Sequence, residues 1–328
     1  MRATNHWSEA IVTSFCDITP TVREFTLQLS APALWHGPGS HLPFQLLLDG
    51  KHQTRSYSLI SQADASTYRV AVKRLPDGRG GSLAMWRLRV GERVRIGEPQ
   101  NFFPLDLTAP AYLLVAGGIG VTALLRMAQA LAQRPAPVRM LLSARSAEEL
   151  AYAALLRQTL GEGFQTFVSS EQQRLDFPME ISALPVGGQL LVCGPNAMLE
   201  AARSAWAKAQ RPRADLRFET FGSSGRLAAH AFQVTIPRQQ LQLTVAADVS
   251  ILEALEMAGV QVLHNCRRGE CGLCVMDVLA SEGQIDHRDV FLSDSEKQQN
   301  KRICVCVSRA SGTITLDSAY RADAAKAA

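Results

Sequence analysis

Five of the seven cysteines lie in one segment towards the end of the sequence. Three of them form the run Cys266-Arg-Arg-Gly-Glu-Cys271-Gly-Leu-Cys274; 29 residues separate Cys274 from Cys304, and 31 separate it from Cys306. The pattern C-x4-C-x2-C…C is the spacing of a plant-type [2Fe–2S] site. Gly269 and Gly272 lie where a loop around sulfide needs positive φ or close backbone approach. A zinc site more usually pairs two C-x2-C hooks, so the segment predicts an iron–sulfur cluster that transfers electrons.

Two glycine-containing turns follow apolar strands in the middle of the sequence. Tyr112-Leu-Leu-Val-Ala116 leads into Gly117-Gly-Ile-Gly-Val-Thr122, and Gln189-Leu-Leu-Val-Cys193 leads into Gly194-Pro195. Glycines between a strand and a helix let the backbone approach a pyrophosphate at the helix N-terminus. The motif is not G-x-G-x-x-G, so a tight packing turn is the alternative. Ligands bind outside the carboxyl ends of parallel strands, so we expect both turns on one sheet edge.

Two weaker motifs could hold an anion and a heterocycle. Arg55-Ser-Tyr-Ser58 ends a predicted strand; its arginine can grip a phosphate and its tyrosine can stack on a ring. Gly80-Gly-Ser82 follows Val72-Lys-Arg74 and offers backbone N–H groups and a hydroxyl next to two cations. By themselves, an ordinary polar strand and a plain loop explain them equally well.

The elements that must position these motifs change in kind along the chain. Alternating apolar residues predict short strands in residues 8–105, at 22–29, 44–48, 68–73 and 93–96. Several short strands in succession suggest a β-barrel. Strands and helices then alternate, which indicates a parallel sheet. A further strand is predicted at 138–142, and helices are predicted at 121–133, 147–160 and 198–209. After Phe221-Gly-Ser-Ser-Gly-Arg, of linker composition, a hairpin is predicted at 232–236 and 241–245. Ser250 and Glu253 form a capping box that opens a helix over 251–258.

Composition narrows the classes of protein. A chain of 328 residues predicts two or three domains, and no apolar run is long enough to span a membrane. Residues 231–328 hold 10 Lys+Arg and 12 Asp+Glu, and residues 1–230 hold 24 and 18. The positive charges are scattered, so phosphate-bearing cofactors explain the excess better than nucleic acid does. Residues 1–9 show no secretory signal, and cysteines gathered in one metal-type motif are typical of a reducing compartment, so we expect the cytoplasm.

The motifs occur in an order that resembles the phthalate dioxygenase reductase family, which includes the reductase component of vanillate O-demethylase. The ordered set also contains Phe218-Glu-Thr-Phe-Gly222, and the resemblance spans about Ile11 to Leu316. It implies a multidomain oxidoreductase. An antiparallel flavin-binding β-barrel would occupy residues 1–107 and an α/β parallel-sheet nucleotide-binding domain 108–222. A linker at 223–231 would lead to an α+β ferredoxin-like [2Fe–2S] domain of β-grasp type at 232–328.

The resemblance also implies roles for individual residues. The flavin would be held by Arg55, Ser56, Tyr57 and Ser58, with Val72, Lys73, Gly81 and Ser82 at its ribityl phosphate. The pyridine nucleotide would be lined by Gly117, Gly118, Gly120 and Thr122, with Cys193, Gly194 and Pro195 beside the nicotinamide. Phe221 would lie near the flavin face. The cluster ligands would be Cys266, Cys271, Cys274 and Cys306.

The cofactors imply the direction of electron flow. A nicotinamide gives up a hydride, a [2Fe–2S] cluster accepts one electron at a time, and a flavin can do both, so the flavin must stand between them. The resemblance implies FMN rather than FAD, and the sequence agrees, because it shows one phosphate cradle, near Arg55 and Ser82, and no platform for an adenosine. NADH is predicted over NADPH, because Arg145 is the lone cation in Ser143-Ala-Arg-Ser146 and Glu171 adds an acid nearby.

The fourth cluster ligand is open on spacing alone, which slightly favours Cys304, and strand alternation puts both sulfurs on one face. In the family the ligand precedes a run ending Ser-Arg-Ala, which here is Val307-Ser-Arg-Ala310 and implies Cys306. His287-Arg-Asp289 is also a family triplet, for which we expect a structural or docking role. Arg267-Arg268 either offset the cluster charge or steer a partner.

The resemblance implies a partner: a separate Rieske-type non-haem iron oxygenase, acting on an aromatic or other small organic compound. A reductase for a diiron or haem monooxygenase is one alternative, although relatives of those commonly carry the ferredoxin first. A redox-sensing or carrier protein without turnover is another.

Overall fold

The computed structural model describes residues 6–48, 50–61, 66–76, 78, 80–221, 230–247 and 249–318. They form two compact units, divided between Glu219 and Thr220. Most of the predicted linker at 223–231 lies outside the described residues. The domain boundaries placed at 107/108 and 222/223 stay predictions.

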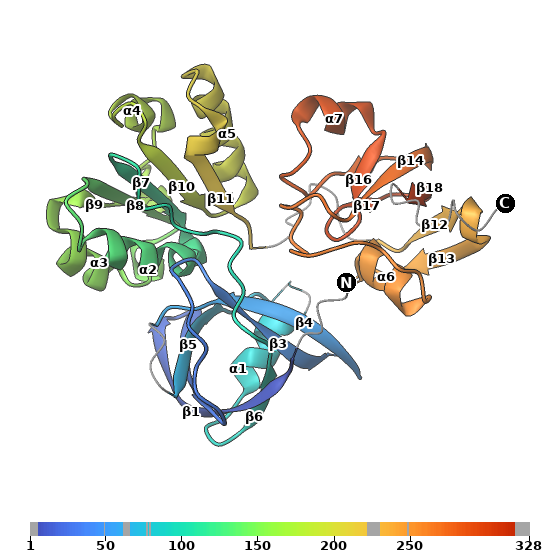
Figure 1. The fold of residues 1–328 in the computed structure, drawn as a ribbon, viewed down its shortest axis with the longest axis horizontal. Helices are drawn as coiled ribbons and strands as arrows, with labels where there is room; N and C mark the ends of the chain where they lie inside the picture. Colours follow the sequence, from blue (N-terminus) through green and yellow to red (C-terminus); the bar gives the residue numbers. More distant parts are fainter. Residues whose placement is uncertain are drawn as a thin grey trace. The chain divides into compact units, whose positions relative to one another are not determined.

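The first part of the first unit is a six-stranded antiparallel sheet that closes on itself (Figure 1). Its strand order is β4-β3-β6-β1-β2-β5, and Leu59, just after β4, bridges Val70 of β5. The strands are β1 (Ser8–Thr19), β2 (Val22–Leu29), β3 (His41–Leu48), β4 (Lys51–Ser58), β5 (Thr67–Lys73) and β6 (Arg93–Ile96). The expected barrel is therefore confirmed.

A short helix, α1 (Gly81–Arg87), stands where the sequence suggested strands and loops. Gly80, at φ 73°, starts it, and Met85 on its inner face is fully buried in the barrel interior. One buried side chain per short helix gives no periodic signal, which is why the pattern of residues did not reveal it.

The second part of the first unit is a parallel sheet of order β11-β10-β7-β8-β9. Figure 1 shows α2 and α3 on one face and α4 and α5 on the other. The strands are β7 (Tyr112–Gly117), β8 (Val138–Ala144), β9 (Phe164–Val168), β10 (Gln189–Cys193) and β11 (Leu216–Glu219). The helices are α2 (Val121–Leu131), α3 (Ala153–Leu160), α4 (Phe177–Ser182) and α5 (Asn196–Lys208). Single 3₁₀ turns are η1 (Gly118–Gly120), η2 (Ala147–Glu149), η3 (Gly161–Gly163), η4 (Ser169–Glu171) and η5 (Arg213–Asp215).

The helix predicted over 147–160 is wrong in its first half. The chain forms η2, and Tyr152 then takes the left-handed conformation, with φ 60°, before α3 begins. A right-handed helix cannot run through such a residue. Ala151 between them is buried in the core, and Leu150 packs against that core. Tertiary packing therefore overrides the local helical pattern.

Two hydrophobic cores fill the first unit. One fills the barrel interior. The other combines Val22 and Ala71 of the barrel with Leu124 of α2 and Leu142 of β8. The barrel and the parallel sheet thus share a core, which fixes one against the other.

The second unit has the β-grasp arrangement that was expected. Its sheet order is β13-β12-β18-β14-β16; β12 and β18 are parallel and the other pairs antiparallel. The strands are β12 (Phe232–Ile236), β13 (Leu241–Val245), β14 (Val275–Glu282), β16 (Arg302–Cys304) and β18 (Thr313–Ser318), with the small pair β15 (Ile285–Asp286) and β17 (Arg309–Ala310). The helices are α6 (Ile251–Met257) and α7 (Asp294–Gln299), with the turn η6 (Pro237–Gln239). The predicted hairpin and the Ser250–Glu253 capping box are confirmed.

Candidate functional site

Both glycine turns lie at the carboxyl edge of the parallel sheet, as expected. β7 and β10 are adjacent and parallel, with Cys193 level with Ala116. The turn Gly117–Thr122 and the segment Cys193–Pro195 therefore leave the sheet side by side. This edge is where α/β sheets bind nucleotides.

Most glycines of this edge are required by packing. A Cβ on Gly120 would lie 2.0 Å from the carbonyl oxygen of Cys193, and one on Gly117 2.5 Å from Pro195 Cδ. A Cβ on Gly194 would lie 3.1 Å from Gly117 Cα. Gly118 differs, because it has φ +53° and open space beside its Cα. The packing explanation therefore covers three of the four glycines, and their contact with a nucleotide stays a prediction.

Two other residues predicted at this edge, Thr122 and Cys193, already have side-chain contacts within the protein. The Thr122 hydroxyl donates to the Ile119 carbonyl at 2.9 Å, so it holds the turn. The Cys193 side chain is buried in the shared core, whereas Pro195 is exposed. Gly194 and Pro195 are thus the part of that motif that a nicotinamide could reach.

The flavin motif on β4 lies against α1. Arg55 donates to the Thr54 carbonyl at 2.9 Å and to Gln53 Oε1 at 2.6 Å. A Cβ on Gly81 would lie 2.7 Å from Arg55 Cγ, so glycine allows the arginine to cross the start of α1. The Arg55 and Gly80–Ser82 motifs, far apart in sequence, are brought together here.

Two side chains of β4 are suited to a bound ring system. The Tyr57 ring packs edge-on against Phe44, with centroids 5.4 Å apart, and burial raises its pKa, so the phenol stays neutral. Ser58 is 3% exposed, and its hydroxyl has no hydrogen-bond partner among the described residues. Buried hydroxyls are normally paired. A ligand with a polar edge, such as a flavin, fits beside this hydroxyl. Ser56 is exposed.

The residues predicted at the flavin phosphate differ in burial and in their contacts within the protein. Val72 is buried in the barrel core. Ser82 Oγ accepts a hydrogen bond from the Leu75 N–H at 3.1 Å. Lys73 Nζ lies 3.0 Å from Glu149 Oε2, so the lysine is already paired with a carboxylate. The Arg55 side chain lies against Gly81, since a Cβ on Gly81 would lie 2.9 Å from its Nε.

The cysteine loop is folded around a sulfur atom. Cys266 Sγ accepts the backbone N–H groups of Arg268, Glu270 and Cys271, each at 3.4 Å. Gly269 and Gly272 have φ of +74° and +73°, as predicted from their positions. A Cβ on Gly272 would lie 2.3 Å from the Phe291 ring. N–H groups converging on one sulfur stabilise a thiolate, which is the form that binds iron.

The structure places Cys306 among the loop cysteines. Its sulfur lies 3.1 Å from Cys274 Sγ. Hydrogen bonds from the thiols of Cys271 and Cys306 lower the pKa of Cys266. Cys304 bonds Cys274 and is fully buried. In the described part of the chain no three such side chains converge as ligands of a single metal ion, so the fit to a two-iron cluster rests on the loop and its N–H groups.

The triplet at 287–289 is a structural support. Asp289 is buried, and its carboxylate accepts the Leu292 N–H at 2.8 Å and the Ser308 hydroxyl at 3.2 Å. Burial alone would raise the pKa of Asp289, but His287 and the Leu292 N–H lower it, so it stays charged. The Val290 N–H bonds the Gly269 carbonyl at 3.0 Å. The triplet thus ties the cysteine loop to the segment after Cys306.

The two loop arginines are in ion pairs. Arg267 lies 2.6 Å from Glu256 Oε1, and Arg268 lies 3.5 Å from Glu270 Oε2 with a side chain only 12% exposed. These pairs favour a local structural role for both arginines over the steering of a partner. Phe221 is 40% exposed, and its predicted place at the flavin face stays a prediction.

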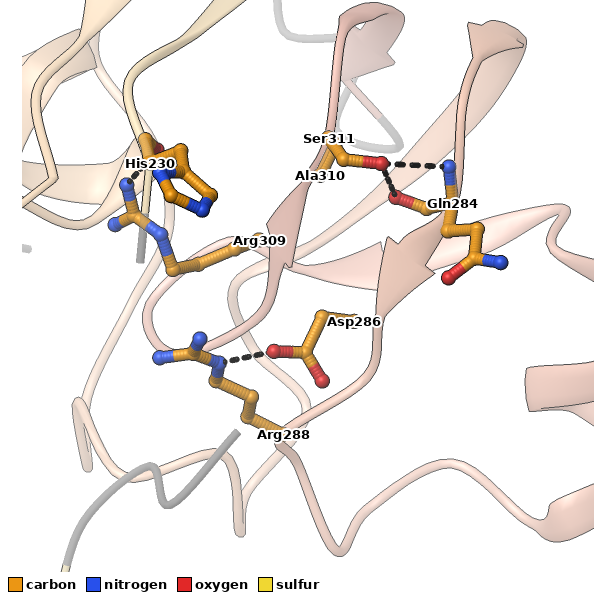
Figure 2. Close-up of a pocket in the computed structure, with 7 residues that line it drawn as sticks. All are labelled: His230, Gln284, Asp286, Arg288, Arg309, Ala310 and Ser311. Atoms are coloured by element: carbon orange, nitrogen blue, oxygen red, sulfur yellow. Dashed lines mark hydrogen bonds and ion pairs between the residues drawn. The ribbon is translucent and has the colours of Figure 1, made fainter. Parts of the chain in front are cut away.

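A hollow of about 180 Å³ in the second unit is lined by none of the predicted site residues (Figure 2). Figure 2 shows Arg309 beside His230, and Arg288 bonded to Asp286 at 2.7 Å. The Arg309 guanidinium donates to the carbonyls of Val249, His230 and Ala246. This residue therefore holds the start of the unit to β17, a role that the sequence did not signal.

No helix in the described ranges is long and apolar enough to cross a membrane.

Three family models match the chain in succession. They are the oxidoreductase FAD-binding domain over residues 9–103, the dimethylamine monooxygenase subunit DmmA-like N-terminal domain over 101–216, and the 2Fe-2S iron-sulfur cluster binding domain over 234–311.

Two curated proteins are similar to this chain over most of their length. The chain is 37% identical over 311 residues to the haem-dependent oxidative N-demethylase beta subunit of Ectopseudomonas mendocina, covering 93% of this chain and 97% of that protein. It is 36% identical over 290 residues to the vanillate O-demethylase oxidoreductase of a Pseudomonas species, covering 84% and 87%. Among solved structures, phthalate dioxygenase reductase matches with a TM-score of 0.78 and 30% identity, covering 95% of this chain and 98% of that one.

Proposed function

The chain belongs to the phthalate dioxygenase reductase family, and from that premise we propose that it takes a hydride from NADH onto FMN. It then passes single electrons through a [2Fe–2S] cluster to a Rieske-type oxygenase. That it is an oxidoreductase with a flavin-binding and a 2Fe–2S domain, like the reductase subunits of multicomponent oxygenases, follows from the matches themselves.

The observation that carries the proposal is the Cys266 loop. Three backbone N–H groups converge on its sulfur, and it follows a flavin-type barrel and a nucleotide-type sheet in the same chain. Bound flavin would supply the exchange between two-electron and one-electron transfer. The protein's own residues bind and orient: Arg55 at a phosphate, Tyr57 and Ser58 at a ring, and Gly118 and Pro195 at the nucleotide edge.

The experiment that tests this function uses the full chain loaded with its cofactors. NADH should bleach the flavin, reduce the cluster and drive rapid reduction of cytochrome c. A carrier or sensor protein would hold a cluster but would not turn over NADH. Absence of NADH-driven cytochrome c reduction in a cluster-loaded, flavin-loaded sample rejects the proposal.

The flavin released from the purified protein is expected to be FMN. Arg55 and the start of α1 would form one compact phosphate site, because the arginine lies close beside Gly81. FAD would need a second platform for its adenosine. Mass spectrometry of the released flavin decides, and FAD as the main species contradicts this prediction.

NADH is expected to be preferred over NADPH. Arg145 is exposed after β8, but the neighbouring turn carries Glu171. The Arg174 guanidinium donates a hydrogen bond to the Ser169 carbonyl at 3.1 Å. A 2′-phosphate usually needs a dedicated cation at this place. The measurement is kcat/KM for each nucleotide; a preference of about tenfold for NADPH, or 1.4 kcal/mol, reverses the assignment.

A haem-dependent partner is the second candidate, favoured by two matches. A haem-dependent N-demethylase subunit is 37% identical over 93% of this chain, and residues 101–216 match a dimethylamine monooxygenase model. The oxygenase that co-purifies with the chain, or is encoded beside it, separates the two. A Rieske partner shows an iron–sulfur spectrum, and a haem partner shows a Soret band; each must be reduced by NADH only when this chain is present.

A further inference from the structure

A polar join between the barrel and the parallel sheet is not part of any predicted motif. Glu149 Oε2 lies 2.5 Å from the Thr21 hydroxyl and 3.0 Å from Lys73 Nζ. The Tyr152 hydroxyl donates to Glu24 Oε2 at 2.8 Å. Glu149 and Tyr152 come from the segment after β8, and their three partners come from the barrel.

These contacts are sheltered from water. The side chains of Glu149 and Glu24 are each 14% exposed, and Arg69 Nε lies 2.8 Å from Glu24 Oε1. Burial alone would raise the pKa of Glu149, but the hydrogen bonds from Thr21 and Lys73 lower it, so the carboxylate stays charged. Hydrogen bonds to a charged, partly buried group are among the stronger ones, and removing one partner leaves the other unsatisfied.

The backbone holds this segment in a strained form. Tyr152 has φ 60° and ψ 11°, a left-handed backbone conformation that residues other than glycine rarely adopt. Such residues persist where the surroundings hold them, and they cluster at functional sites. Leu150 and Tyr152 also pack against the core that contains Val22 and Ala71 of the barrel.

The join connects elements that lead to the two predicted cofactor sites. Glu149 follows the carboxyl end of β8, which pairs with β7 at the nucleotide edge. Lys73 ends β5, and two residues later the Leu75 N–H bonds Ser82 at the start of α1. One carboxylate thus connects the nucleotide edge with the strand that leads to the predicted flavin phosphate.

We propose that Glu149 and Tyr152 are positioning residues for hydride transfer, which hold the nucleotide-binding sheet in register with the flavin barrel. This rests on the proposed function. The hydride donor and its acceptor would be held by different folds, so their separation depends on the shared core and on this join. A misplacement of about 1 Å can cost roughly a hundredfold in rate.

The test compares Glu149→Gln with Glu148→Gln in the cofactor-loaded full chain. Glu148 is the matched control, because it is exposed in the same 3₁₀ turn. At saturating NADH, stopped-flow flavin reduction in Glu149→Gln should fall by roughly tenfold or more. The Kd for NADH should stay at its wild-type value. The rate of electron transfer from flavin to cluster after photoreduction should also be unchanged. Tyr152→Phe should show a smaller loss of the same kind, and Glu148→Gln none.

A second measurement reports on the join without turnover. In the flavin-free chain, amide hydrogen exchange over residues 19–24 and 147–153 should be faster in Glu149→Gln than in the wild type, and unchanged in Glu148→Gln. If Glu149→Gln does not fold, Thr21→Val removes one of its hydrogen bonds while keeping the Lys73 pair, and should give an intermediate loss.

Two results would overturn the proposal. One is flavin reduction in Glu149→Gln at the wild-type rate, whether or not thermal stability falls. The other is an equal loss of flavin reduction in Glu148→Gln. The failure of the proposed function is distinct, because the wild-type chain itself would then not oxidise NADH.

Discussion

Cys306→Ala is expected to abolish the visible absorption of the iron–sulfur cluster, and Cys304→Ala to preserve it. Cys306 Sγ is 3.1 Å from Cys274 Sγ and also bonds Cys266, so it reaches two of the loop sulfurs. Cys304 is the last residue of β16, pairs with Val275 and is fully buried. A plant-type site takes one distant thiolate in addition to the three from the loop.

The chain turns between the two cysteines, because the N–H groups of Val307 and Ser308 both bond the Cys304 carbonyl, at 3.3 and 3.0 Å. Strand alternation, which placed both sulfurs on one face, does not apply past Cys304. That turn presents Cys306 to the loop.

The measurement is the visible and EPR spectrum of each variant after identical reconstitution, followed by cytochrome c reduction with NADH. Cys306→Ala should lose roughly all cluster absorption while flavin bleaching persists, because the ligand set falls to three. Cys16→Ala, at an exposed free cysteine of β1, is the control for removal of a thiol. A cluster kept in Cys306→Ala and lost in Cys304→Ala assigns the ligand to Cys304 instead.

Local signals predicted much of this molecule. The Ser250–Glu253 capping box needs only four residues, and it starts α6 where it was expected. The positions of Gly269 and Gly272 in the cysteine loop likewise predicted positive φ or close backbone approach, and both glycines have positive φ. The apolar run at 189–193 became β10 with the same bounds, since it is buried throughout.

The contacts that the sequence did not reveal join residues far apart in the chain. Glu149 meets Thr21 across 128 residues, and nothing near either one signals the other. Lys73, read beside Arg74 as part of a phosphate site, is paired with that same carboxylate. Charges are visible in a sequence, but their partners are set by the tertiary fold.

The loop arginines show the same limit. Arg267 and Arg268 stood out as a basic spot next to the cluster ligands. Glu256, on α6, and Glu270, inside the loop, offset them in the folded unit. Net charge over a domain could not predict this pairing, because each pair depends on where one side chain points.

Gly120→Ala is expected to destabilise the first unit by about 3 kcal/mol or more and to remove nucleotide binding. The added Cβ would lie 2.0 Å from the carbonyl oxygen of Cys193 and 2.6 Å from its carbonyl carbon. Both are backbone atoms of β10, so no side chain can move aside. The carboxyl ends of β7 and β10 would have to separate.

Gly118→Ala is the matched control, two residues earlier in the same turn. Nothing lies within 4 Å of its added Cβ, but φ is +53°. Its cost is therefore conformational, about 1 kcal/mol. Thermal unfolding and NADH titration of both full-length variants test the pair, with cluster absorption as the check that the second unit is intact. Equal losses in the two variants would mean that the turn is governed by backbone conformation. A much larger loss at Gly120 means that close packing of the two strands builds the nucleotide edge, and that open space beside Gly118 is what remains for a ligand.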